Sequence, residues 1–188
     1  IFQVTAFSIL QEIKRGTSVR WIKDAGGSIT IACAGKLLPQ FIIFSLTGLA
    51  MQGMMFGLWD FPLHSNPINM IVAMLLLVAS SQAFALLISC TIPNLRFALS
   101  ILSLLGILSF SIGGFSFPVE DMYPAVGIFS YLIPIRYYFL IYVNVALNGY
   151  EIYYCRWDYI VMILFLLAPM GMLWKLKRYS LNPVYIPC

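Results

Sequence analysis

Charged residues are scarce in this sequence: Asp, Glu, Lys and Arg make up only 10% of its 188 residues, whereas 61% are hydrophobic. Soluble domains carry about 25% charged residues. The shortage excludes an ordinary soluble domain and predicts an all-α polytopic membrane protein. The net charge of +4 does not indicate nucleic-acid binding, because the basic residues lie near the ends of apolar runs and form no patch.

Residue patterns typical of enzymes and metal sites are also missing. The one histidine, His64, falls in a predicted turn between two apolar runs. The sequence has no HExxH, GxSxG or glycine-rich phosphate loop. The cysteines show neither a CxxC pair nor the spacing of metal ligands; they are Cys33, Cys90, Cys155 and Cys188. We therefore expect no catalytic residue, no metal and no cofactor bound by this chain.

Four apolar runs are each close to the length of about 20 residues that crosses a bilayer, and they predict four transmembrane helices. Their expected ranges are 37–59, 68–92, 97–115 and 157–174. Residues 1–10 form a shorter apolar run, which we interpret as the end of a preceding span. Since the chain starts at Ile1, we expect it to be the C-terminal part of a longer protein.

The segment 119–147 is apolar but interrupted, and it predicts a re-entrant hairpin of two short helices. Pro134 divides it, and the second part makes only about 21 Å of helix, too little to cross a bilayer. Arg136 follows this proline. We expect it at the inner bend of the hairpin, where it either pairs with Glu120 or Asp121 or faces a wet cavity at a subunit interface.

The basic residues lie mostly on one side of the predicted membrane, which sets the orientation of the spans. Of the 11 Lys and Arg residues, only Arg136 and Arg156 would lie on the side opposite both chain ends. The side that holds the chain ends is therefore predicted to be the cytoplasm.

Small residues at four-residue spacing predict two faces on which helices approach closely. Gly53 and Gly57 form a GxxxG pattern, and Ser81, Ala85 and Ser89 recur every four residues.

The segment 11–36 is predicted to be cytoplasmic, and its part 11–24 mixes charges of both signs with Val19, Trp21 and Ile22. We expect Gly16 to break the helix there and Gly26-Gly27 to form a loop. One interpretation is a solvated loop that only sets orientation. The other is a docking element for a soluble partner, with Trp21 as its apolar anchor. A loop that only sets orientation has no need of an apolar tryptophan, which favours docking.

Several stretches, in matching order and spacing, resemble one family. Three features are typical of that family. One span ends in a charged run closed by Gly-Thr, and the next span begins with Gly-Lys-x-x-Pro. A later span ends in Gly-Phe-x-Phe-Pro, and short outer helices follow it. Here these are TAFSILQEIKRGT (5–17), GKLLPQ (35–40), SIGGFSFPVEDMYP (111–124), YLIPIRYY (131–138) and ALNG (146–149). The chain thus resembles the C-terminal half of the permease subunit of type-2 ATP-binding-cassette (ABC) exporters.

The sequence departs from the family pattern after Gly-Thr. SVRWIKDAGGS (18–28) stands where the family has an acidic residue, apolar residues and Thr-Pro. The departure affects the detail of the docking surface and leaves the expected fold unchanged.

The resemblance implies an exporter permease in the bacterial cytoplasmic membrane that moves a drug-like amphiphile, lipid, glycan or peptide outward. ATP and magnesium would bind a partner ATPase subunit, so this chain would not be an enzyme. A second permease copy or a related permease would complete a dimer, with membrane lipids around it and no nucleic acid. The alternatives are a non-transporting membrane scaffold or assembly factor and, less favoured, an intramembrane enzyme, which would need more polar residues within the spans.

The resemblance also implies two sets of functional residues. The set expected at the ATPase contact is Glu12, Lys14, Arg15, Gly16, Thr17, Arg20, Trp21 and Lys23. The set expected at the re-entrant gate or path is Pro118, Glu120, Asp121, Tyr123, Pro134, Arg136 and Tyr137. Glu120 and Asp121 are equally suited to cap a short helix, because acidic residues at a helix start complement its dipole.

Overall fold

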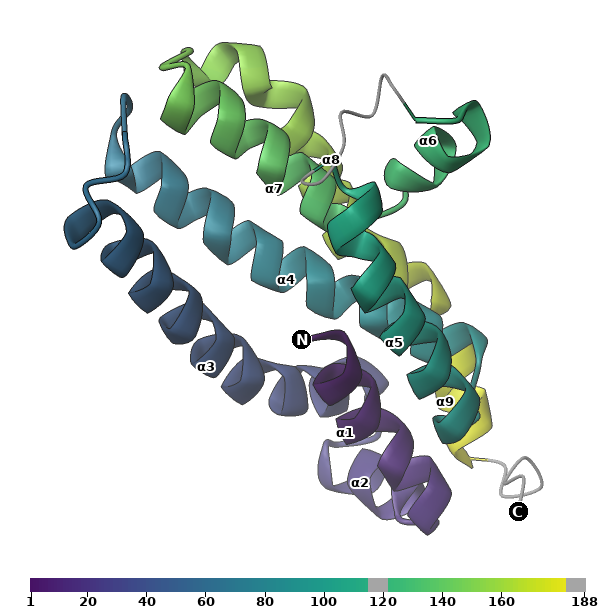
Figure 1. Ribbon diagram of the computed structural model, residues 1–188. Helices are drawn as coiled ribbons and strands as arrows, with labels where there is room; N and C mark the ends of the chain where they lie inside the picture. The colour runs from purple at the N-terminus through teal and green to yellow at the C-terminus, as the bar shows by residue number, and fades with distance from the viewer. Residues whose placement is uncertain (115–121, 182–188) are drawn as a thin grey trace.

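The computed structural model in Figure 1 describes residues 1–114 and 122–181, and within these ranges the chain forms helices and loops with no strand. Two shorter helices, α1 (Phe2–Arg15) and α2 (Ser18–Asp24), come first. Four segments of the described chain are long and apolar enough to cross a membrane: α3 (Ile29–Gly57), α4 (Pro67–Thr91), α5 (Leu95–Ile112) and the final segment Ile152–Leu181. The predicted all-α fold with four spans is confirmed.

Local sequence signals explain where several helices begin and end. Gly16 ends α1 with φ +71°, a left-handed conformation that glycine adopts without a steric penalty. At the start of α4 the Asn66 side chain accepts a hydrogen bond from the Ile68 amide. The Asn94 side chain caps α5 in the same way. Such caps satisfy backbone donors that have no partner inside the helix.

Two helices extend beyond the predicted spans. α3 begins at Ile29 and passes through Lys36, and the last helix continues through the charges of 175–178 to Leu181. A charged side chain limits how deep a helix can lie in lipid. It does not end the helix, because helix ends are set by backbone conformation and capping. The charges at 175–178 therefore lie within α9, and the predicted bounds of the span, 157–174, concern the membrane and not the end of the helix.

The α-helix of the final segment, Ile152–Leu181, is also interrupted partway along its length. A 3-10 turn, η4 (Ala168–Met172), separates α8 (Arg156–Leu167) from α9 (Leu173–Leu181). Pro169 lies in this turn, and its ring nitrogen cannot donate the hydrogen bond that a continuous α-helix requires. A second 3-10 turn, η3 (Ile152–Cys155), precedes α8.

The predicted hairpin of two short helices is present in the described chain. α6 (Pro124–Ser130) and α7 (Pro134–Ile141) each begin with a proline, and α7 runs on into the π-helical turn η2 (Tyr142–Leu147). α7 packs against α4 and α8, whereas α6 projects away from the bundle beside the end of α5 (Figure 1). Proline suits the first turn of a helix because the amide there lacks a helical partner.

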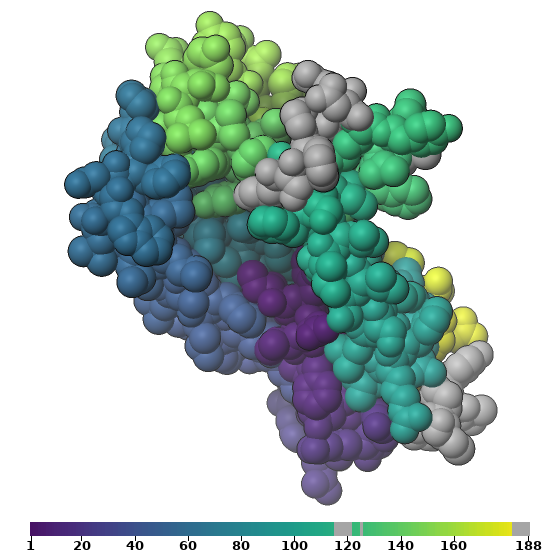
Figure 2. Space-filling model, in the orientation of Figure 1, coloured from purple at the N-terminus to yellow at the C-terminus, as the bar shows by residue number. Residues whose placement is uncertain are grey.

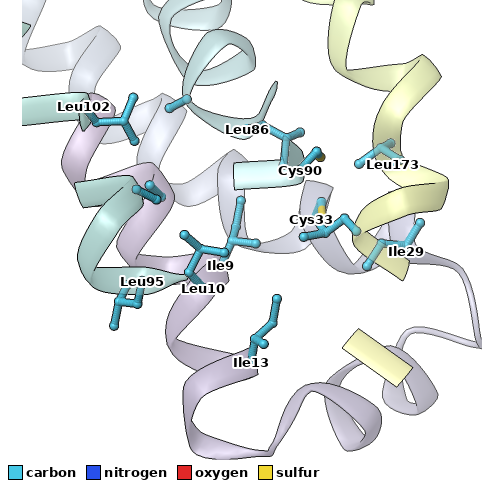
Figure 3. Close-up of a cluster of buried hydrophobic side chains, with 14 of the residues drawn as sticks. Ile9, Leu10, Ile13, Ile29, Cys33, Leu86, Cys90, Leu95, Leu102 and Leu173 are labelled. Atoms are coloured by element: carbon cyan, nitrogen blue, oxygen red, sulfur yellow. The ribbon is translucent and has the colours of Figure 1, made fainter. Parts of the chain in front are cut away.

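α4 is the central helix and takes part in two hydrophobic clusters. One cluster joins α4 to α1, α3, α5 and α9 and includes Leu10, Cys33, Leu86 and Leu173 (Figure 3). The other joins α4 to α7, η2 and α8 and includes Met70, Ile141 and Met162. The first lies at the end of the bundle that carries α2, and the second at the end that carries the hairpin (Figure 1).

Candidate functional site

The turn between α1 and α3 forms a compact element that we call the elbow (residues 12–27). Its first bend is made by Gly16, where the Thr17 amide donates a hydrogen bond to the Glu12 carbonyl at 3.1 Å. Its second bend is made by Gly26 and Gly27, which have φ of +68° and +80°. Both glycine bends were predicted, and α2 lies between them.

A polar network centred on Lys36 ties the elbow to α3. The Lys36 Nζ atom lies 2.5 Å from Glu12 Oε1 and donates to the Ser8 carbonyl at 2.8 Å. The same ammonium group lies 4.9 Å from the centre of the Trp21 ring, within range of a cation–π interaction. Thr17 completes the network, since its hydroxyl donates a hydrogen bond to the Glu12 carboxylate.

This network keeps Glu12, which lies outside the candidate spans, in its ionised form. Burial would raise the pKa of Glu12, but hydrogen bonds from Lys36 and Thr17, together with the charges of Lys36 and Arg15, lower it below its ordinary value of 4.5. The pair therefore contributes to stability above pH 4.5, and the contribution is lost as the pH falls through the lowered pKa.

The inner side of α2 is fixed to the last helix. The Ser18 hydroxyl donates to the Ser180 carbonyl at 2.7 Å, and Lys177 Nζ donates to the Gly27 carbonyl at 2.8 Å. Ile22 is buried in the hydrophobic cluster between these two contacts. α2 is thus attached at one end to α3 and along its inner side to α9.

The outer side of α2 exposes a different set of residues. Val19, Arg20 and Lys23 are exposed, as are Lys14, Arg15, Gly16 and Thr17 beside them. Trp21, the expected anchor for a partner, is only partly exposed and packs against its own chain's hydrophobic cluster. The apolar side chain that α2 presents outward is therefore Val19, which is 48% exposed.

In the hairpin, Arg136 is buried and has partners that the sequence did not indicate. Its Nη1 atom donates to the Ser130 hydroxyl at 2.7 Å, and its guanidinium lies 4.4 Å from the centre of the Tyr131 ring. Among the residues that the structure describes, its Nε atom has no hydrogen-bond partner. The Arg136 charge also acts on the Asp158 carboxyl at the start of α8.

The other predicted gate residues fall into three groups. Pro134 and Tyr137 are buried beside Arg136, and the Tyr137 hydroxyl donates to the Tyr131 carbonyl at 2.9 Å. Tyr123 is 77% exposed and stays apart from them. The remaining predicted gate residues, Pro118, Glu120 and Asp121, lie outside the described residues, and so does the expected pairing of Arg136 with the two acids.

The two predicted packing faces differ. Ser81, Ala85 and Ser89 are buried, and Ala85 belongs to the cluster that α4 shares with α1. Figure 2 shows a hollow above the start of α1, where Phe2, Ser81 and Gly106 line a cavity of about 440 Å³.

Gly53 and Gly57 are exposed, and a Cβ atom added to either would meet nothing within 4 Å. Within the described residues, no other helix approaches this GxxxG face that closely, and its role in helix packing stays a prediction.

A close approach that was not predicted occurs one turn earlier on α3. A Cβ atom at Gly48 would lie 1.8 Å from Met74 Cε and 3.2 Å from Met74 Cγ of α4. Gly48 is buried. Because glycine has a hydrogen where other residues have a Cβ atom, the Met74 side chain can fill the space beside it. In the sequence this contact is indicated only by the glycine itself, because no second small residue lies four positions away to complete a pattern.

Neither metal nor thiol chemistry is suggested by the geometry of the described part of the chain. Within residues 1–114 and 122–181, no three His, Cys, Asp or Glu side chains gather in a group that could hold a metal ion. Cys33, Cys90 and Cys155 are buried as free thiols.

Comparison with known proteins gives one result. A family model described as ABC-2 family transporter protein matches residues 1–175. The comparisons with curated proteins and with solved structures give no match.

Proposed function

This chain belongs to the ABC-2 transporter family as a membrane permease, and from this premise we propose that it serves an exporter driven by a separate ATPase subunit. The observation that carries the proposal is the family match over residues 1–175, together with four helices able to span a membrane. The proposed transport is outward across the bacterial cytoplasmic membrane. The proposed substrate is a drug-like amphiphile, a lipid, a glycan or a peptide.

The elbow is the proposed contact for the ATPase. Its outward face offers one apolar side chain, Val19, between basic residues that include Arg20 and Lys23. Its inner face is fixed by Ser18 to α9, and Glu12 links its start to Lys36 of α3. A push on the outward face would therefore move α3 and α9 together. Trp21 acts here as a positioning residue, because its ring lies under Lys36.

A second permease, identical or related, is proposed to complete the transport path. The exposed Gly53 and Gly57 support a helix contact between the two subunits, since no atom of the described residues would lie within 4 Å of a Cβ atom at either position. Small residues allow such close contacts in lipid. The hairpin around Arg136 is the proposed outer gate. Closure of two ATPase subunits on nucleotide would rock the spans and open the path outward.

The ATPase contact is tested by a variant restricted to the outward face of α2. We expect Val19→Ser, Arg20→Ser and Lys23→Ser together to reduce the ATPase that co-purifies with the full-length permease by about tenfold or more, a loss of about 1.4 kcal/mol of binding free energy. Membrane insertion should remain normal, because all three side chains are exposed. The measurement is the ratio of ATPase to permease after affinity purification.

The matched control removes the same number of charges at the same end of the bundle. Lys175→Ser with Arg178→Ser alters two exposed residues of α9 and should leave the ratio unchanged. If the α2 variant co-purified with as much ATPase as the wild type, the docking interpretation would be wrong, and α2 would be a solvated segment that only sets orientation. Substrate-stimulated ATP hydrolysis by the wild-type complex would then separate an exporter from a non-transporting scaffold.

A further inference from the structure

A cavity of about 430 Å³ opens between α3, α4 and the η4–α9 segment, away from both sites described above. Its lining is almost entirely apolar and includes Ala34, Leu38 and Phe41 of α3, Ala83 of α4, and Pro169 and Met170 of η4. Figure 3 shows Cys33, Leu86 and Leu173, which belong to the inner wall, meeting from three helices. The break at η4 thus forms one wall of the cavity.

The few polar groups of the cavity are placed at its edge or already bonded. Gln82 Nε2 donates to the Leu37 carbonyl at 3.3 Å, which ties α4 to α3 and occupies this amide. Thr30 lies at the end nearest the elbow. A buried water needs two to four polar partners, so the interior between these groups favours a hydrocarbon occupant.

The length of the cavity wall suits an acyl chain. From Thr30 to Phe41, which both line the cavity, α3 extends for about 16 Å at 1.5 Å per residue. The acyl chain of a membrane lipid is apolar over its whole length, so it can lie along this wall.

A cation, Lys177, lies near the Thr30 end of the cavity without lining it. Lys177 lies one turn beyond Leu173 on the same face of α9, since residues four apart are neighbours on a helix. Its Nζ atom is 2.8 Å from the carbonyl of Gly27, three residues before Thr30. An ammonium group has three donors, so the bond to Gly27 does not exhaust the capacity of Lys177 to bind a ligand. An apolar slot that ends in a cation matches the chemistry of an anionic lipid.

We propose that this cavity holds one acyl chain of an anionic phospholipid from the leaflet at the elbow end, with the headgroup phosphate bound by Lys177. In the proposed orientation this is the cytoplasmic leaflet. The lipid would fill the space between α3 and α9, the two helices to which the elbow is fixed. It would thus act as a resident wedge between the two helices that move with α2.

The test uses the full-length protein in phosphatidylcholine vesicles that contain phosphatidylglycerol with a photoactivatable diazirine in its acyl chain. Illumination followed by peptide mass spectrometry should place cross-links on Leu38, Phe41 and Met170. Ala34→Phe should reduce these cross-links severalfold. Ala34 is exposed and lines the cavity, so the new ring fills the slot without displacing packed atoms. Ala50→Phe is the matched control, an exposed alanine of α3 outside the cavity, and should change nothing.

The headgroup is tested in the same vesicles by competition between unlabelled phosphatidylglycerol and phosphatidylcholine. Lys177→Gln should abolish the preference for phosphatidylglycerol, whereas Lys177→Arg and the control Lys175→Gln should keep it. Cavity cross-links that persist in Ala34→Phe, or a preference that survives Lys177→Gln, would overturn the proposal. Absence of lipid cross-links at all three positions in the wild-type protein would do the same, because another chain could then cover the cavity. The assay contains neither ATP nor ATPase, so its outcome is independent of whether the chain exports.

Discussion

At the scale of single residues, Arg136 concentrates the most interactions in the hairpin. It is buried, yet its guanidinium is held by one hydroxyl, that of Ser130 at the end of α6, and one ring, that of Tyr131, the next residue. A buried cation is retained only where such partners compensate for lost hydration. The arrangement favours a structural role for Arg136, in which it fixes the angle between α6 and α7.

We expect Arg136→Ala to lower the amount of folded protein, because it removes a charged hydrogen bond worth about 1.5–3 kcal/mol and the contact with Tyr131. Arg136→Lys should recover only part of the loss, since lysine keeps the charge but not the planar fork. The measurement is the monodisperse fraction on size exclusion with the midpoint of thermal unfolding.

Ser130→Ala should shift the unfolding midpoint in the same direction as Arg136→Ala. Arg156→Ala is the control, because Arg156 also lies over an aromatic ring, that of Tyr153 at 4.3 Å, but is exposed. Normal abundance of Arg136→Ala with loss of export would instead indicate a gate residue. Normal abundance with normal export would contradict both roles.

At the scale of helices, the contact between α3 and α4 is made at one of the glycines of α3, Gly48, and not at Gly53 or Gly57. Gly48 faces Met74 at contact distance, whereas a Cβ atom built at Gly53 or Gly57 would meet no atom of the described residues within 4 Å. In lipid the association of helices depends on close packing of this kind. The same residue type therefore has two functions on one helix, an internal contact at Gly48 and a free face at the other two positions.

We expect Gly48→Leu to lower the thermal midpoint of the purified protein, because overpacking a well-packed contact costs about 1–3 kcal/mol. Gly53→Leu should leave the fold of the single chain unchanged. Since Met74 occupies the space beside Gly48, Met74→Ala should relieve Gly48→Ala, so that the double variant loses less than the sum of the single losses. Equal losses for Gly48→Leu and Gly53→Leu would contradict the assignment.

At the scale of the whole molecule, the described turns between the spans lie at two opposite ends. α2, the turn at Asn94 and the end of α9 share one end (Figure 1). The α3–α4 turn lies at the other end, where the His64 amide donates to the Ala146 carbonyl of η2 at 2.9 Å. The arrangement agrees with one topology for all four spans, while the side assigned to the cytoplasm remains a prediction from the basic residues.

Single cysteines should report that topology in intact cells that are treated with a membrane-impermeant thiol reagent. Replacements at Lys23, Asn94 and Lys177 should resist labelling, and those at Asn66 and Tyr153 should react. The native Cys33, Cys90 and Cys155 are buried, so only Cys188 needs to be replaced by serine. Labelling at Asn94 from outside would contradict the four-span topology, and a fully inverted pattern would reverse the assigned sides.

Much of the architecture was readable from the sequence, since its signals act over a few residues. Apolar length predicted the four spans, Gly16 the end of α1, and Pro134 the break in the hairpin. The order of its motifs predicted the ABC-2 permease family, which the family match confirms. Each of these features depends on a local conformational preference or on a run of residue types.

The tertiary structure alone decided which residues meet. Lys36 pairs with Glu12 from 24 positions away, and Ser18 bonds to Ser180 from 162 positions away. No spacing rule relates such partners, because their distance is set by how helices pack and not by the period of one helix. For the same reason the sequence could place Trp21 on a charged segment but could not decide that its ring turns inward, under Lys36, rather than toward a partner.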